Sequence, residues 1–389
     1  MIRKLAIFTA LALTACTAGA QLYTDVVRSE MARNPEASYI DGLEGKLKWN
    51  YTTGLELKAM LDVYSANGDE SILKYVDAWY DAVISEDGVI GGKYKKSNYS
   101  LDHICPGRTL FQLYDITGKE KYRKAMDSLY VQLKEQPRNA QGGFWHKKIY
   151  PDQMWLDGLY MAQPFYAEYT VRYVADEAEK AANIADITNQ FKQAYDSCYD
   201  PATKLLRHAC DFSRSMFWCD PETGQSKHAW GRALGWFSMA LADVTGILGE
   251  DTPKELKDML SDVLQPLRKF CDPKTGLCYQ VLDRPGEEGN YLEATCNVMF
   301  SYACLKGVNL KVIADKGYAR KLYRKTIRQF VTNGDDGLVN LNQCCEVAGL
   351  GGKENRSGDY DYYIHERIRA NDPKGIGPLI WAALEYDKL

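Results

Sequence analysis

Hydrophobic and polar residues alternate along most of the chain with the three- to four-residue period of amphipathic α-helices. The pattern predicts helices in pairs, each pair joined by a short turn that contains a glycine. The first pair runs over 55–66 and on to about residue 84, across a turn at Gly68. The second runs over 109–115 and on to about residue 133, across a turn at Gly118. We interpret each pair as a helical hairpin.

The same pattern continues to the end of the chain and predicts a repetitive, all-α architecture. Further helices are expected over 153–175, 179–197, 229–248, 253–270, 291–306, 312–332 and 373–387. A helix pair with its loop recurs roughly every 50–70 residues, as in repeat folds. Because no linker rich in Pro, Ser or Gly interrupts it, we predict a single domain over 21–389. A closed ring and an open solenoid of helix pairs both fit this pattern.

The first twenty residues have the pattern of a signal peptide. Arg3 and Lys4 precede an apolar run over 5–15, and small residues at 18–20 precede Gln21. The run is too short to cross a bilayer as a permanent helix, and no later segment is long and apolar enough to do so. We therefore expect cleavage after residue 20 and a periplasmic or secreted protein. A lipid anchor on Cys16 is the alternative, less favoured because no polar tether follows it.

Composition and charge exclude several classes of protein. The 389 residues are 46% hydrophobic and 26% charged, which is typical of a globular protein and not of a disordered chain. The net charge of −4 offers no field to hold a nucleic acid or an anionic membrane, so neither is expected as a partner. Tyr, Trp and Phe number 27, 8 and 11; such aromatics suit a sugar-binding surface and a helical core equally well.

The cysteines permit disulfides but do not require them. Without Cys16, ten remain, and two pairs bracket turn-like segments, at positions 271 and 278 and at positions 198 and 210. Local bridges are conceivable there, but cysteine is also a common small core residue, and we favour that interpretation. The adjacent pair at 344–345 lacks a second Cys or His pair at zinc-ligand spacing, so no metal is expected.

Two aspartates stand at predicted helix starts and are candidates for catalysis. Asp157 lies among large apolar neighbours, where ionisation is costly and the pKa of a carboxyl rises, as a general acid requires. Asp102 offers a second carboxylate on another repeat. Capping of a helix N-terminus is the structural alternative for both, and the sequence alone favours it for Asp157. If the two converge, each influences the protonation of the other.

Basic and aromatic residues gather in three further segments. Trp230 and Arg232 share a helix start and could give a sugar ring a stacking face and its carboxylate a guanidinium. His208 follows a short extended segment, and His146 and Lys147 follow a glycine-rich loop. A core tryptophan with a surface arginine, and solvated loop charges, are the structural alternatives. The chain shows no Ser-His-Asp order and no phosphate-binding glycine loop.

Taken together, these segments resemble the unsaturated glycuronyl hydrolases of glycoside hydrolase family 105. The likeness covers nearly the whole mature chain in the same order. It is carried by LDHICPGR at 101–108, GGFWHKKIYPDQMWLDGLYM at 142–161, the His208 segment, DPETG…HAWGRALGW at 220–236, and DYDYYI…NDPKGIGPLIWAALEY at 359–386. The resemblance implies an (α/α)6 barrel, an unsaturated oligosaccharide as substrate and no cofactor.

Residue by residue, the resemblance implies roles for the candidates. Asp157 matches the catalytic acid and Asp102 the assisting carboxylate. The matches to substrate-contacting positions are His146, Lys147, His208, Trp230 and Arg232. This sequence departs from many relatives at two places, with Leu234 where a small or polar residue is frequent and Cys105 where asparagine is common. We expect these changes to bear on the aglycone preference more than on the chemistry.

The implied reaction is hydration of an enol ether. Protonation of C4 of a 4,5-unsaturated uronic acid gives an oxocarbenium ion, water adds at C5, and the opened ring releases the aglycone. Unsaturated galacturonate linked to rhamnose, from lyase-treated rhamnogalacturonan, is the expected substrate. The alternatives are an unsaturated glucuronyl hydrolase of family 88 type, a sugar epimerase, and a secreted sugar-binding protein.

Overall fold

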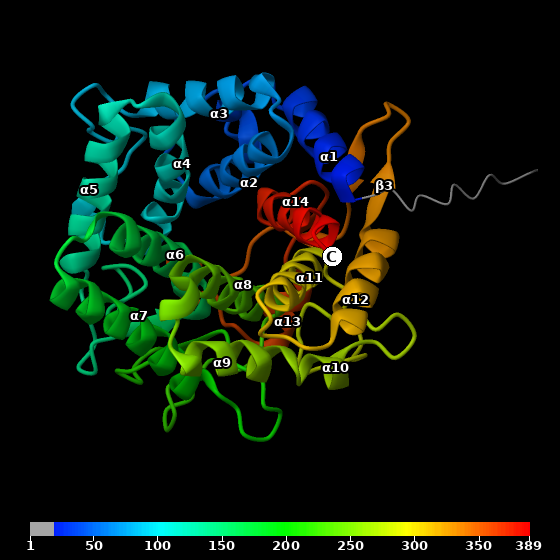
Figure 1. Cartoon of the computed structure of the whole chain (residues 1–389). Helices are drawn as coiled ribbons and strands as arrows, with labels where there is room; N and C mark the ends of the chain where they lie inside the picture. Colours follow the sequence, from blue (N-terminus) through cyan, green and yellow to red (C-terminus); the bar gives the residue numbers. More distant parts are fainter. Residues whose placement is uncertain (1–18) are drawn as a thin grey trace, which may run out of the picture.

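The structure is a computed structural model that describes residues 19–389, and in this part the chain forms fourteen α-helices and six short strands. Twelve of the helices form two concentric layers (Figure 1). The outer helices are α1 (Gly19–Arg33), α3 (Glu70–Val83), α5 (Glu120–Lys134), α7 (Glu177–Cys198), α9 (Lys254–Leu264) and α12 (Lys316–Phe330). The inner helices are α2 (Tyr51–Asn67), α4 (Arg108–Thr117), α6 (Leu156–Tyr173), α8 (Gly231–Leu248), α11 (Ala294–Asn309) and α14 (Pro373–Asp387).

The inner helices form a closed ring. Helix α6 packs on α8, α8 on α11 and α11 on α14, and α14 returns to pack on α2, the first inner helix. Outer helix α1 also packs on α14, so the two ends of the described chain lie side by side (Figure 1). The fold is therefore an (α/α)6 barrel, which confirms the predicted fold and decides between the ring and the solenoid.

The predicted hairpin turns are present and have a simple physical basis. Helix α2 ends at Gly68 and α4 ends at Gly118, both in the left-handed conformation, with φ of 71° and 66°. Glycine adopts this conformation without the steric cost that a Cβ brings. After Gly68, the Asp69 side chain accepts a hydrogen bond from the Ser71 backbone N–H and so caps α3.

The predicted helices differ from the structure at several places. The helix expected over 253–270 is divided into α9 and the short α10 (Leu267–Phe270), because Pro266 has no N–H to donate within a helix. The stretch expected to begin at residue 153 begins at 156, since Gln153–Trp155 forms strand β1 instead. Helices α1 and α13 (Tyr360–His365) were not predicted. The predicted signal peptide, 1–20, and Cys16 fall almost entirely outside the described residues.

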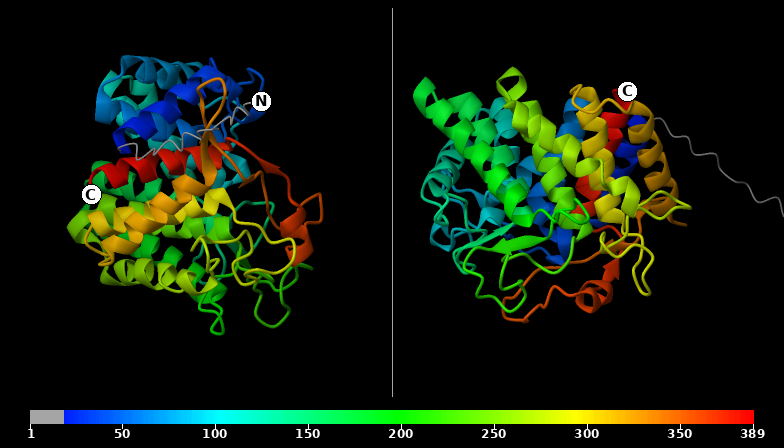
Figure 2. Two further views of the ribbon diagram at one scale, coloured as in Figure 1. Left: turned by 90° about the vertical axis from the view of Figure 1, so that its right-hand side faces the viewer. Right: turned by 90° about the horizontal axis from the view of Figure 1, so that it is seen from below.

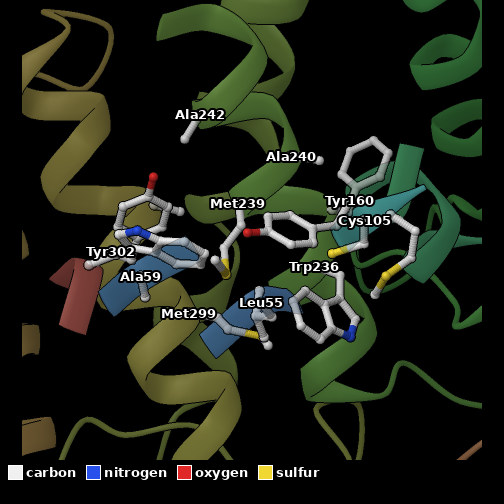
Figure 3. Close-up of a cluster of buried hydrophobic side chains, with 14 of the residues drawn as sticks. Leu55, Ala59, Cys105, Tyr160, Trp236, Met239, Ala240, Ala242, Met299 and Tyr302 are labelled. Carbon is white, nitrogen blue, oxygen red and sulfur yellow. The ribbon is translucent and has the colours of Figure 1, made fainter. Parts of the chain in front are cut away.

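The interior of the ring is filled by large apolar side chains. Helix α8 is buried over nearly its whole length, as expected of a helix that is apolar on all sides. The Tyr160 ring from α6 packs against Trp236 from α8 with 4.8 Å between their centroids, and Met239 and Met299 lie close by (Figure 3). This packed core fills the middle of the ring, so a candidate site is expected at an end of the barrel.

The connections at one end of the barrel are longer than those at the other (Figure 2). They carry α13 and all six strands, and the pairs are antiparallel. The strands are β1 (Gln153–Trp155) with β2 (Ala209–Asp211), β3 (Val331–Asn333) with β4 (Val339–Leu341), and β5 (Cys344–Cys345) with β6 (Ile368–Arg369). The inner helices begin at this end, so it is where the candidate site residues meet.

Candidate active site

An open cavity of about 610 Å³ lies where the inner helices begin. Its wall combines aromatic, acidic and basic side chains with two exposed apolar ones. The lining residues are Asp41, Lys48, Trp49, Asn50, Tyr51, Thr52, Asn98, Ser100, Asp102, His103, Lys147, Ile149, Glu346, Val347 and Lys374. They come from segments more than three hundred residues apart in the sequence, and the closure of the ring brings them together.

Asp102 is held as an anion on the wall of this cavity. It lies in a short 3-10 turn, Leu101–His103, and its Oδ2 is 2.6 Å from the Lys147 ammonium. Its Oδ1 is 3.5 Å from Nε2 of His146. Burial by itself would raise the pKa of the Asp102 carboxyl, but Lys147 and His146 outweigh it and leave the pKa below the ordinary value. Asp102 is therefore ionised at neutral pH.

His146 is buried beside Asp102 in a stack of rings. Its imidazole lies parallel to the indole of Trp155, with 4.9 Å between centroids, and the Tyr150 ring also stacks on Trp155, with 5.1 Å between centroids. Burial lowers the pKa of His146 to about 4, and the opposing effects of Asp102 and Asp157 do not restore it. His146 is thus neutral at neutral pH and serves as a fixed hydrogen-bonding group.

Asp157 has surroundings of a different kind. It is the second residue of α6, and β1 directly precedes the helix and pairs with β2, which follows His208. This pairing sets Oδ2 of Asp157 3.3 Å from Nε2 of His208. Within the described residues, this oxygen is buried without a hydrogen-bond partner, and no lysine or arginine is paired with it. Asp157 therefore lacks the cationic partner that Asp102 has in Lys147.

His208 is fixed from its other side. Its Nδ1 is 2.7 Å from the phenol oxygen of Tyr363, a residue of α13 that is 155 positions away in the sequence. Burial raises the pKa of the Tyr363 phenol well above its ordinary value, so the hydroxyl stays neutral. The ring of Trp230 packs against both residues, with centroids 4.8 Å from His208 and 5.9 Å from Tyr363. The imidazole therefore has one orientation, with Nε2 toward Asp157.

Trp230 and Arg232 lie behind this layer and not on the open surface. The Trp230 indole N–H donates to Oε1 of Gln280, and the ring is buried. Arg232 is only 1% exposed; its guanidinium donates to the backbone oxygens of Cys345 and Glu346 and lies 3.6 Å from the Glu293 carboxylate. These positions give both residues a supporting role, and contact with substrate stays a prediction.

Comparison with known proteins agrees with this arrangement. The family model described as Glycosyl Hydrolase Family 88 matches residues 22–389. A solved family 105 glycoside hydrolase from C. acetobutylicum ATCC 824 is 41% identical, with 94% of this chain and 99% of that chain covered and a TM-score of 0.87. This protein belongs to glycoside hydrolase family 88/105. It is a hydrolase of the unsaturated glycuronyl type.

Two further relatives place this family 88/105 enzyme in context. A 24.9 kDa protein in the picA locus of Rhizobium radiobacter is 33% identical over 234 residues, which cover 58% of this chain and 97% of that protein. An unsaturated glucuronyl hydrolase from Bacillus sp. GL1, responsible for the degradation of glycosaminoglycan, has a TM-score of 0.65 over 94% of this chain and 95% of that chain. At 12% identity, the second likeness shows the shared fold alone.

The barrel brings all seven predicted site residues of the family 88/105 enzyme to one end. They form two groups, Asp102 with His146 and Lys147, and Asp157 with His208, Trp230 and Arg232. Tyr51 lies on the cavity wall with Asp102, and burial, together with that carboxylate, raises the pKa of its phenol well above the ordinary value.

Sequence reasoning missed three residues of the site. Each contacts a segment that is distant in the sequence: Tyr51 contacts Trp236, and Trp155 and Tyr363 both contact His208. A sequence signal for two of them is their place at the start of a helix. Tyr51 is the first residue of α2 and Trp155 directly precedes α6, and the candidate aspartates were singled out at such positions.

The departures at Leu234 and Cys105 lie in the core and not in the cavity wall. The expectation that they affect the aglycone therefore finds no support in their positions.

In the part of the chain that the structure describes, no cluster of three or more His, Cys, Asp or Glu side chains is arranged to hold a metal ion. Over the same residues, none of the helices combines the length and the hydropathy that a membrane span requires.

Proposed function

We propose that this enzyme removes 4,5-unsaturated galacturonate linked to rhamnose from the non-reducing end of lyase-generated pectin oligosaccharides. The observation that carries the proposal is the unequal pair of carboxyls. Asp102 is fixed as an anion by Lys147, whereas Asp157 keeps a buried oxygen free of cations and faces a fixed imidazole. One proton donor and one permanent anion at the same end of the barrel suit a reaction that begins with protonation and passes through a cation.

In the proposed reaction, Asp157 delivers its proton to C4 of the unsaturated ring. The positive charge that develops at C5 and the ring oxygen is stabilised by the nearby negative charge of Asp102. Water then adds at C5 and returns a proton to Asp157, and the resulting hemiketal opens and releases the aglycone. The net change is the consumption of one water molecule, and no redox step occurs.

The side chains of the cavity wall are suited to an aglycone that is weakly polar and uncharged. Ile149 is 73% exposed and Val347 is 47% exposed, and both line the cavity near Asp102. A 6-deoxy sugar such as rhamnose has a methyl group that can cover such side chains, and burial of apolar area is favourable. Two of the lysines that line the cavity are already in ion pairs, Lys147 with Asp102 and Lys374 with Asp372. Their positive charges are therefore less able to bind the sulfate groups of a sulfated aglycone.

The reaction type is tested by turnover in heavy water and in ¹⁸O-labelled water. We expect deuterium at C4 of the released keto-acid and labelled oxygen at C5, because C4 is protonated and C5 takes up water. A saturated galacturonide has no enol ether and should not react. Label at the anomeric carbon without deuterium at C4, or turnover of the saturated sugar at a similar rate, would refute hydration.

The aglycone is tested separately with a panel of lyase products. Fragments of rhamnogalacturonan, homogalacturonan and glycosaminoglycans are offered, and loss of the near-ultraviolet enol absorbance is followed. We expect the rhamnogalacturonan fragment to have the highest kcat/KM, and Ile149→Ser to lower it severalfold through KM. Ile116→Ser, an exposed isoleucine of α4 outside the cavity wall, is the matched control. Preference for a glycosaminoglycan fragment would favour the family 88 type of substrate.

We further propose that the enzyme is exported and begins at Gln21. N-terminal sequencing of protein recovered from the periplasm of a Gram-negative host tests this. A lipid-modified Cys16 at the N-terminus would favour the anchored alternative.

A further inference from the structure

One pair of cysteines far from the catalytic groups has its sulfur atoms in contact. Sγ of Cys271 is 3.0 Å from Sγ of Cys278, although both are free thiols. Among the ten cysteines in the described part of the chain, no other two sulfur atoms are in hydrogen-bond contact. A disulfide bond is about 2.05 Å long, so an approach of about 1 Å would join this pair.

The backbone between the two cysteines already holds them together. Cys271 directly follows α10, and the Asp272 N–H donates to the Leu277 oxygen over 2.8 Å. The chain turns back at Gly276, which has φ of 70°, and the Asp272 carboxylate accepts from Thr275. The loop is therefore closed by hydrogen bonds before any covalent bond forms, and little further ordering is required.

The two thiols differ in access. Cys271 is half-buried, whereas Cys278 is buried behind it. The contact with Cys271 and then burial raise the pKa of the Cys278 thiol well above its ordinary value. An external oxidant therefore reaches Cys271 first, and Cys278 reacts second, from inside the protein.

We propose that Cys271 and Cys278 form a structural disulfide by exchange with a small disulfide oxidant such as oxidised glutathione. The Cys271 thiolate attacks one sulfur of the oxidant, forms a mixed disulfide and releases one thiolate. The Cys278 thiolate then attacks Sγ of Cys271, forms the internal bond and releases the second thiolate. Two protein thiols are oxidised and one disulfide oxidant is reduced to two thiols, so atoms and electrons balance.

The bond would connect the outer layer to the structure behind the active site. The Cys278 backbone is held by Asn297 of α11 through two hydrogen bonds, of 2.9 and 2.8 Å. Gln280, two residues further on, accepts from the Trp230 indole and, with its backbone oxygen, from the N–H of Gly231. A disulfide would therefore anchor the end of α10 to an inner helix and to the segment that supports Trp230.

Peptide mapping of the folded enzyme tests the proposal. Trypsin cleaves after Lys274, inside the loop, so peptides 270–274 and 275–306 stay joined only if a disulfide connects them. The enzyme is equilibrated with an excess of oxidised over reduced glutathione, alkylated and digested without reductant. We expect the joined peptides in the wild type and separate peptides after reduction.

Two variants identify the partner, because peptide 275–306 also contains Cys296 and Cys304. Cys278→Ser should abolish the joined species, and Cys296→Ser, another buried thiol, should retain it. Oxidised wild type should also melt about 3–6 °C above the reduced form, a difference that Cys278→Ser should lose. Separate peptides from the oxidised wild type, or a joined species that persists in Cys278→Ser, would overturn the proposal.

Discussion

The two aspartates of the site are chemically identical side chains, and their neighbours alone make them different. Asp102 has the Lys147 ammonium at 2.6 Å, whereas Asp157 has an imidazole at 3.3 Å and an oxygen without a hydrogen-bond partner. A cation favours the ionised form of a carboxyl, and its absence leaves protonation possible. The contacts therefore fix Asp102 as the anion, and the role of Asp157 as proton donor stays a prediction.

Asp157→Asn removes the proton donor and keeps the shape of the side chain. We expect kcat to fall by about 10²–10⁴, as is typical when general acid catalysis is lost, with the fold unchanged by circular dichroism. Asp196→Asn, on the exposed face of α7, is the control and should keep full activity. Activity of Asp157→Asn within a few-fold of wild type would remove Asp157 from the mechanism.

Tyr363 is a positioning residue, since it acts through His208. Tyr363→Phe removes the partner of Nδ1 and frees the imidazole to rotate away from Asp157. The loss of about one hydrogen bond predicts a three- to tenfold fall in kcat, with KM little changed, and a shifted pH profile of kcat. Tyr362→Phe, the adjacent residue, should leave the pH profile as it is. An unchanged profile in Tyr363→Phe would limit Tyr363 to a structural role.

The sequence singles out the two candidate aspartates but not the residues that orient them. Asp102 and Asp157 lie in contiguous motifs with distinctive neighbours, so a resemblance can find them. Tyr363 is one of 27 tyrosines, and only the folded chain shows that it meets His208. Arg232 was predicted to lie at a helix start, which is correct, but its burial beneath the cavity depends on contacts with α11 and β5.

Helices were the most predictable elements, because their amphipathic period and the glycines between them are local signals. The short strands were not predicted, since β1 and β2 are three residues each and depend on a partner more than fifty residues away. Close contacts between helices are equally invisible in the sequence. Gly54 of α2 is such a case, because a Cβ added there would lie 2.5 Å from the Cα of Pro106.

Gly54→Ala tests this close contact. Backbone atoms of the 105–107 turn cannot move aside as a flexible side chain can, so we expect a loss of about 1–3 kcal/mol in the free energy of unfolding. Gly317→Ala is the matched control, since it lies at the start of the outer helix α12 and its Cβ would make only an ordinary contact, at 3.5 Å. The control should be neutral or stabilising by up to about 1 kcal/mol. Equal effects in urea denaturation would contradict the close packing of α2.

At the scale of the whole molecule, the ring is closed by contacts that no local pattern encodes. Similar helical hairpins can stack into an open solenoid or form a closed ring. The packing of α14 on α2 makes this fold a closed ring. A polar network around Asp243 also crosses the interior. Asp243 lies twelve residues after the first residue of α8, which is about 18 Å along the helix at about 1.5 Å per residue. There Asp243 accepts hydrogen bonds from Arg108 of α4 and from Lys306 of α11, at 2.8 and 2.6 Å.

This network predicts how stability depends on pH. Burial by itself would raise the pKa of Asp243, but Lys306 and Arg108 lower it to about 2. A carboxyl with a lowered pKa in the folded state stabilises the fold fully above its unfolded pKa, near 4, and loses that contribution as the pH falls toward 2. The wild type should therefore lose about 2–3 kcal/mol through Asp243 in this window.

Asp243→Asn should remove that part of the pH dependence and leave Arg108 and Lys306 as uncompensated buried cations. We expect a loss of about 3–5 kcal/mol at neutral pH and a shallower decline in stability between about pH 4 and 2, measured by urea denaturation across the pH range. Asp258→Asn, which removes only the exposed pair with Lys254, should change stability by less than about 1 kcal/mol. If the free energy of unfolding of Asp243→Asn declines as steeply as that of the wild type when the pH falls, the Asp243 carboxylate is not ionised in the folded barrel. Arg108, Asp243 and Lys306 would then not be the charged connection between three inner helices that their distances indicate.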